Sequence, residues 1–207
     1  MDFKQVKLML DLSTALIFGL AWLVTVLYLR LKKNKNFTYL VFFTIFYIYI
    51  FKVLDYTIFQ FQSLLLLKHF LPNLIVNGQT ARESLNLVPL TTLTREDVKT
   101  SLLNILLFVP FGFGLPFITS LRLKKVVVVG VLFSIILELL QLLTGYMAHV
   151  TFRVTDINDV VFNTLGVAIG YSVFIVFVRT SRSAVRNRKQ SANLTLQYIV
   201  ERPQVDK

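Results

Sequence analysis

Five long apolar segments constrain this chain more than any other feature of its sequence. A helix needs about 20 residues, at about 1.5 Å of rise each, to cross about 30 Å of hydrocarbon. The apolar segments run approximately from Leu8 to Leu29, Phe37 to Val53, Ser101 to Thr119, Val126 to Leu143 and Ile157 to Val178. Apolar residues make up 55% of the 207 positions, which is high for a soluble protein. We therefore predict an all-α integral membrane protein, a bundle of about five transmembrane helices.

The second segment has a less definite end than the others. Apolar residues continue through residues 54–71, after Lys52 and Asp55, which are three apart and are predicted to form a local ion pair. This continuation can span the membrane, tilt within it or lie on its surface, and the sequence leaves these alternatives open.

The basic residues predict the orientation of the bundle, because Lys and Arg in short loops favour the cytoplasm. With the N-terminus outside, 14 of the 22 basic residues lie inside: Arg30, Lys32, Lys33, Lys35, Arg122, Lys124, Lys125, Arg179, Arg182, Arg186, Arg188, Lys189, Arg202 and Lys207. The opposite orientation would place only the other eight inside. We predict that the N-terminus lies outside, and that residues 179–207 form a solvated, basic cytoplasmic tail along the membrane surface.

Composition also excludes several classes of function. The chain has no cysteine, which rules out disulfides, thiolate nucleophiles and cysteine-ligated metals. The net charge of +11 is explained by topology, with anionic membrane lipids as secondary contacts. The basic cluster at residues 179–189 has no interleaved aromatic residues on which bases could stack, so we expect no nucleic-acid partner.

Polar residues follow helical spacing in the fifth segment. Asp156, Asp159, Asn163, Gly166 and Gly170 are separated by 3, 4, 3 and 4 residues and so share one helix face. The two glycines form a small-xxx-small pair, which allows a second helix to pack closely. We expect this face to point into the bundle.

Two other segments carry polar residues at a comparable depth. Glu138 and Gln141 lie on the fourth segment, about 9 Å and about 4 Å below its outer end at 1.5 Å per residue. Asn104 lies about one turn into the third segment. A carboxylate in hydrocarbon requires a partner, and Arg153, in the short loop before the fifth segment, is the predicted partner of Glu138. We therefore predict a shared polar site that opens outward.

A purely structural role is the alternative for each of these residues. Asp156 alone fits a helix cap at least as well as a functional group. Asn104, Gln141 and Asn163 could be hydrogen-bonded contacts between helices, and Glu138 with Arg153 a buried ion pair that fixes the packing. The combination of Glu138, Arg153 and Asp159 favours function, since ionisable clusters within membranes usually mark functional sites.

An ordered set of motifs runs through residues 86–166 of the chain. The motifs are Asn86-Leu87-Val88-Pro89, then Asn104 before Phe108-Val109-Pro110-Phe111-Gly112, then Glu138-x-x-Gln141, and finally Arg153-x-x-Asp156-x-x-Asp159-x-x-x-Asn163-x-x-Gly166. This ordered set resembles the VanZ-like family. Two positions depart from the family pattern: Leu90 stands where Phe is frequent, and Asn158 where a further Asp is frequent. The resemblance covers residues 84–178, so we expect a VanZ-like domain there, after two N-terminal helices and an outer segment in residues 1–83.

The resemblance implies a multi-pass protein of the bacterial cell membrane that is linked to resistance to teicoplanin, a glycopeptide. The motif positions Asn86, Asn104, Glu138, Gln141, Arg153, Asp156, Asp159 and Asn163 are the expected binding residues. Their expected ligand is a membrane lipid, a lipid-linked cell-wall precursor or the acyl chain of a lipoglycopeptide.

An intramembrane enzyme acting on a lipid head group is the second hypothesis. Glu138 or Asp159 would then be the general base, and Arg153 would hold phosphate. Oxygen atoms of Glu138, Asp156 and Asp159 are candidate ligands for Mg²⁺ or Ca²⁺, although nothing in the sequence requires a cofactor. A transporter is the weakest hypothesis, because no chain of ionisable residues continues to the inner side.

Overall fold

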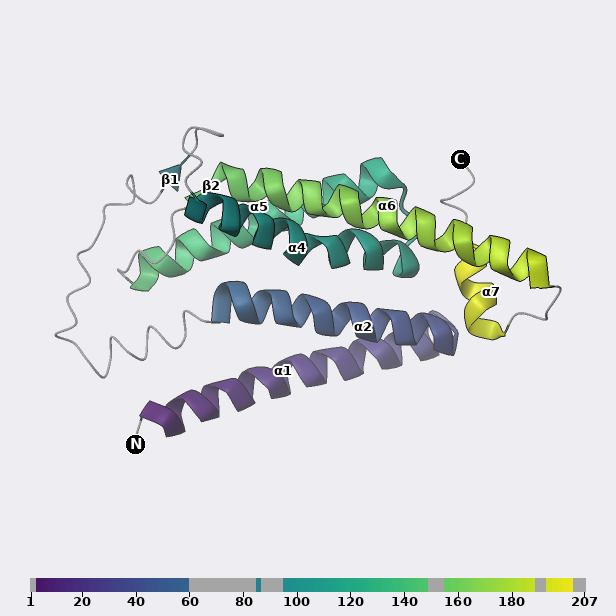
Figure 1. Ribbon diagram of the computed structural model, residues 1–207. Helices are drawn as coiled ribbons and strands as arrows, with labels where there is room; N and C mark the ends of the chain where they lie inside the picture. Colours follow the sequence, from purple (N-terminus) through teal and green to yellow (C-terminus); the bar gives the residue numbers. More distant parts are fainter. Residues whose placement is uncertain (1–2, 60–84, 87–94, 149–154, 189–192, 203–207) are drawn as a thin grey trace.

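The computed structural model of the chain describes residues 3–59, 85–86, 95–148, 155–188 and 193–202 (Figure 1). The long α-helices are α1 (Phe3–Leu31), α2 (Phe37–Leu54), α4 (Arg95–Ile118), α5 (Leu123–Ala148) and α6 (Ile157–Arg188). Shorter elements are the π-helix η1 (Asp55–Phe59), α7 (Leu194–Val200), and the two-residue strands β1 (Leu85–Asn86) and β2 (Thr155–Asp156). The predicted all-α architecture is therefore confirmed, with one minimal strand pair added.

All five long helices are long and apolar enough to cross a membrane. The candidate spans are Asp11–Leu31, Phe37–Thr57, Val98–Ile118, Leu123–Leu143 and Ile157–Arg186, so each predicted segment lies mainly within one span. Large apolar side chains on their outer faces, such as Leu16, Leu106 and Leu132, are more than half exposed. An apolar surface of this extent suits a lipid environment. The chain is a multi-pass membrane protein.

Helix α2 continues into η1, which accounts for the first five residues after Leu54. The predicted ion pair joins the two elements, with Lys52 Nζ of α2 lying 3.3 Å from Asp55 Oδ2 of η1. Residues 60–71, the rest of the stretch whose placement the sequence left open, lie outside the described residues.

Helices α4 and α6 lie side by side, and three glycines bring their backbones together (Figure 1). A Cβ built on Gly112 would lie 2.0 Å from the carbonyl oxygen of Val167, and one on Gly170 would lie 2.0 Å from that of Val109. A Cβ on Gly166 would lie 2.3 Å from the carbonyl oxygen of Ile105. The expected close contact at Gly166 and Gly170 is present, and Gly112 completes it from the opposite helix.

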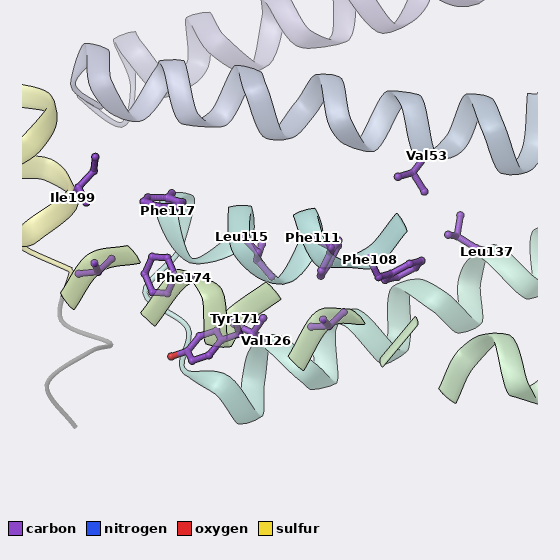
Figure 2. Packing of buried hydrophobic residues seen from close by; sticks show 12 residues of the cluster. Val53, Phe108, Phe111, Leu115, Phe117, Val126, Leu137, Tyr171, Phe174 and Ile199 are labelled. Atoms are coloured by element: carbon purple, nitrogen blue, oxygen red, sulfur yellow. The ribbon is translucent and has the colours of Figure 1, made fainter. Parts of the chain in front are cut away.

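Aromatic side chains pack between the helices outside the glycine contact. Phe111 of α4 stacks on Phe133 of α5 with ring centroids 5.2 Å apart. Phe117 of α4 meets Phe174 of α6 edge to face at 5.0 Å. Figure 2 shows Phe108, Phe111 and Phe117 along α4, with Phe174 beside Phe117. Because α4 contributes most of these rings, it is the central helix of the core.

The C-terminal region differs from the solvated tail that we predicted. Helix α6 continues to Arg188, and the chain then returns as α7, which begins after the capping residue Asn193. Ile199 of α7 is only 9% exposed, and Tyr198 stacks on Phe42 of α2 with ring centroids 5.6 Å apart. Ile199 and Tyr198 therefore pack against the bundle, and this burial outweighs solvation of the surrounding basic residues.

The glycine contact can be tested with single added methyl groups. Gly170→Ala should lower the free energy of unfolding by about 1–3 kcal/mol, because backbone atoms of α4 cannot move aside cheaply. Gly19→Ala is the matched control, since a Cβ there meets nothing within 4 Å. The control should be neutral or slightly stabilising, because alanine favours a helix over glycine. Thermal unfolding in detergent measures the stability of both variants. Equal effects of the two substitutions would contradict the close contact.

The predicted orientation can be tested by cysteine labelling, because the chain has no native cysteine. Ser183→Cys lies at an exposed position near the end of α6, and Lys99→Cys at an exposed position near the start of α4. With the N-terminus outside, a membrane-impermeant maleimide should label Lys99→Cys in intact cells and Ser183→Cys only after lysis. The reverse pattern would invert the topology.

Candidate functional site

Polar side chains from α4 and α6 meet near the end of the bundle where α6 begins. Asn104 Nδ2 donates a hydrogen bond of 2.6 Å to Asp159 Oδ1. Asn104 is 7% exposed, whereas Asp159 is partly exposed. Asp159 lies about two helical turns before Gly166 on α6, and Asn104 is next to Ile105, whose carbonyl oxygen approaches Gly166, so the two backbones are close enough for these short side chains to meet. Asn104 therefore fixes the orientation of the Asp159 carboxylate.

A second polar contact joins α5 to the same face of α6. Asn163 Nδ2 donates to Ser134 Oγ at 2.8 Å. Ser134 is fully buried and Asn163 is 5% exposed. The other amide atom, Asn163 Oδ1, is buried and accepts no hydrogen bond within the described structure. A buried acceptor of this kind carries a desolvation cost that a hydrogen-bond donor would relieve.

Glu138 and Gln141 extend the polar face of α5. Both are buried, with exposures of 7% and 6%. Gln141 Nε2 donates to the backbone oxygen of Thr57 in η1 at 3.3 Å. This hydrogen bond ties η1, which continues α2, to α5. We use the name polar cluster for Asn104, Ser134, Glu138, Gln141, Asp159 and Asn163.

The two short strands bring two distant motifs together at the entrance to the cluster. Strands β1 and β2 are parallel, and Asn86 is paired in register with Asp156. Both residues are partly exposed. Asp156 Oδ1 accepts a hydrogen bond of 2.8 Å from the backbone N–H of Asn158, in the first turn of α6. Asp156 thus caps the helix, which is the structural role that we weighed for it.

The structure also limits two of our predictions. Arg153, the predicted partner of Glu138, lies outside the described residues. Among the described side chains, no three His, Cys, Asp or Glu residues form a group that could hold a metal ion. Glu138, Asp156 and Asp159 are all described, so the structure does not gather these candidate ligands into one metal centre.

Two residues outside the predicted binding set support the cluster. Ser134 shares the helical spacing of Glu138 and Gln141 on the fourth segment, but a serine within a membrane helix commonly bonds its own backbone, so this spacing alone did not mark it as a binding residue. Thr57 contributes a backbone oxygen, for which no side-chain pattern exists. Only the packing of η1 against α5 reveals that contact.

The arrangement provides hydrogen-bond acceptors at two depths. Partly exposed carboxylates of Asp156 and Asp159 lie at the entrance, and the buried carbonyl oxygen of Asn163 lies deeper. Polar groups in an apolar environment interact strongly with complementary groups, because water competes weakly there. The described part of the site can therefore receive N–H and O–H donors at the membrane boundary.

Comparisons with known proteins agree with the motif resemblance. Neither the curated proteins nor the solved structures include a match to this chain. The family model described as VanZ/LLP1 matches residues 56–178. The match begins before residue 84, where we expected the domain to start, and so includes Thr57, the partner of Gln141. Because the matched region covers more than half of the 207 residues, the chain belongs to the VanZ/LLP1 family.

Proposed function

We propose that the polar cluster binds a lipid or lipid-linked ligand at the outer surface of a bacterial cell membrane. This binding would reduce the susceptibility of the cell to teicoplanin-type lipoglycopeptides. The observation that carries the proposal is the polar contact shared by membrane helices, above all the 2.6 Å hydrogen bond from Asn104 to Asp159. Polar groups are costly at this depth and usually serve a function.

The chemistry of the cluster favours a ligand rich in hydrogen-bond donors. The described acceptors are the Asp159 carboxylate and Asn163 Oδ1 within the cluster and the Asp156 carboxylate at its entrance. Such acceptors complement the N–H groups of a peptide and the hydroxyl groups of a sugar. Both occur in lipid-linked cell-wall precursors and in lipoglycopeptides.

The surroundings of the cluster favour a ligand with an apolar anchor. Leu102 and Leu106 of α4 and Val161 and Leu165 of α6 lie near the cluster in sequence and are 46–64% exposed on the outer helix faces. An acyl or prenyl chain could stay in the lipid beside these residues while the polar head group reaches the entrance. A drug with an acyl chain, such as teicoplanin, would then be affected more than vancomycin, which lacks one.

An enzyme that acts on a lipid head group is the second candidate. The observation in its favour is the fixed orientation of the Asp159 carboxylate by Asn104, because a general base must be held within hydrogen-bond reach of its proton. Binding and catalysis make different demands on this residue. An amide can accept a hydrogen bond but cannot take up a proton at neutral pH.

Drug susceptibility tests the resistance proposal. Cells that express the wild type should tolerate more teicoplanin, with no change for vancomycin. Asp159→Ala removes the oriented carboxylate and should abolish this protection. Ser172→Ala is the matched control, because Ser172 is a polar, exposed residue of α6 outside the cluster. Membrane levels are matched by immunoblot. If the wild type gives no protection, or if both variants lose it equally, the proposal is wrong.

Asp159→Asn separates binding from catalysis, because it keeps the shape and an acceptor for Asn104. For a binding site we expect partial protection, since one weakened hydrogen bond changes affinity by about tenfold. For general-base catalysis by Asp159 we expect no protection at all. The measurement is the teicoplanin concentration that stops growth, compared among the wild type, Asp159→Asn and Asp159→Ala. Protection by Asp159→Asn equal to that of the wild type would exclude both roles for the charge.

A further inference from the structure

A second polar feature lies at the opposite end of the bundle from the polar cluster. An open cavity of about 500 Å³ is bordered by the α1–α2 turn, the end of α4 and helix α7. These segments lie together at the end of the bundle where α1 ends and α2 begins (Figure 1). The lining residues are Asn34, Lys35, Asn36, Tyr39, Ile118, Thr119, Ser120, Tyr198 and Arg202. We call this space the basic cavity.

The charges that line the basic cavity among the described residues are positive. Lys35 and Arg202 are the two described residues of fixed charge in its wall, and none of the described lining residues is Asp or Glu. Within the described residues, the one ion pair found is Lys52 with Asp55, so neither cation is neutralised by a described carboxylate. A cavity walled by protein and lined by one sign of charge concentrates ions of the opposite sign.

Arg202 is held in place by neighbouring backbone groups. Its Nε donates to the backbone oxygen of Tyr198, and its Nη1 donates to the backbone oxygen of Phe117, both at 3.1 Å. The guanidinium carbon also lies 3.8 Å from the centre of the Tyr198 ring. With these contacts in place, Arg202 also lines the basic cavity. A guanidinium that is already oriented loses little entropy when it binds an anion.

Arg182 supports this arrangement from α6. Its Nε donates to the Val200 oxygen and its Nη2 to the Arg202 oxygen, both at 2.7 Å. Tyr198 donates its hydroxyl hydrogen to the Phe117 oxygen. Burial raises the pKa of the Tyr198 hydroxyl above its usual value of 10.0, and the Arg202 charge opposes that shift only in part. Tyr198 therefore stays protonated at neutral pH and keeps α7 attached to the end of α4.

The opposite wall supplies further donors. Asn34 has a φ of 48°, a left-handed conformation that asparagine tolerates and that turns the chain into the cavity wall. Arg30 Nη1 donates to the Lys35 oxygen at 3.1 Å and braces the same turn. Asn36 accepts from the Tyr39 N–H through Oδ1, which leaves its amide N–H groups as donors. The partial positive charge at the start of α2 adds to the field of Lys35.

The position of the cavity matches the level of lipid head groups. Two candidate spans meet it, since one begins at Phe37 and another ends at Ile118. A group bound there would lie where hydrocarbon gives way to the polar interface. A phosphate has oxygen atoms for several donors at once and pairs well with arginine.

We propose that the basic cavity binds a phosphate group, carried by an anionic membrane lipid or free in solution. Lys35 and Arg202 supply the charge, and the amide groups of Asn34 and Asn36 supply further hydrogen bonds. This site is separate from the polar cluster, with which it shares no residue. Its failure would leave the proposed function of the polar cluster unchanged.

Native mass spectrometry of the full chain in uncharged detergent tests the site. Three probes are added separately: phosphatidylglycerol, phosphatidylcholine and inorganic phosphate. Lys35→Gln removes one charge without removing a hydrogen bond of the fold, because the described contact of its side chain is with the Tyr39 ring, 4.7 Å away. Lys124→Gln is the matched control, since Lys124 is an exposed cation of α5 that does not line the cavity.

We expect phosphatidylglycerol or inorganic phosphate to bind the wild type and to bind Lys35→Gln about tenfold more weakly, with no change for Lys124→Gln. Preference for phosphatidylglycerol over inorganic phosphate assigns the site to a lipid, and the opposite preference assigns it to a soluble phosphate. Equal weakening in both variants would reveal general attraction to positive charge and would overturn the proposal. Equal binding of phosphatidylcholine and phosphatidylglycerol that neither variant alters would also overturn it.

Discussion

The close approach of α4 and α6 is the contact on which the rest of the structure depends. Apolar side chains gain little by leaving lipid for one another, so membrane helices associate through close packing and hydrogen bonds. Gly112, Gly166 and Gly170 allow the two backbones to touch, with carbonyl oxygens lying where a Cβ would otherwise be. This contact also fixes the register of the helices. In that register Asn104 lies opposite Asp159, and the polar cluster can form.

Two prolines make α4 depend on its neighbours. Pro110 and Pro116 lie inside the helix and lack the N–H groups that would bond the carbonyls of Leu106 and Gly112. Side chains from elsewhere donate to backbone carbonyls nearby: Tyr49 of α2 bonds the Leu107 oxygen at 2.7 Å, and Tyr198 of α7 and Arg202 bond the Phe117 oxygen. The helix remains one continuous element because α2, α6 and α7 surround it.

The sequence predicts the features that depend on local composition and spacing. It does not predict which side chains meet, because those contacts depend on how the helices pack. The five spans follow from runs of apolar residues, and Gly166 with Gly170 follows from helical spacing. The pairing of Asn104 with Asp159 rather than with Gln141 depends on the rotation of each helix, which hydropathy does not specify. Helix α7 was missed because seven residues are too few for a periodic signal, although Asn193 before an apolar run is a recognisable cap.

The two ends of the bundle differ in their polar chemistry, and α4 connects them. Near its start, Asn104 belongs to a cluster dominated by acceptors, and at its end the Phe117 carbonyl anchors the arginine of a cavity lined by cations. The glycine contact lies between these sites and resists sliding, because a small shift would drive a backbone carbonyl into a helix. The fold suits two sites that are held at a fixed separation across the bundle.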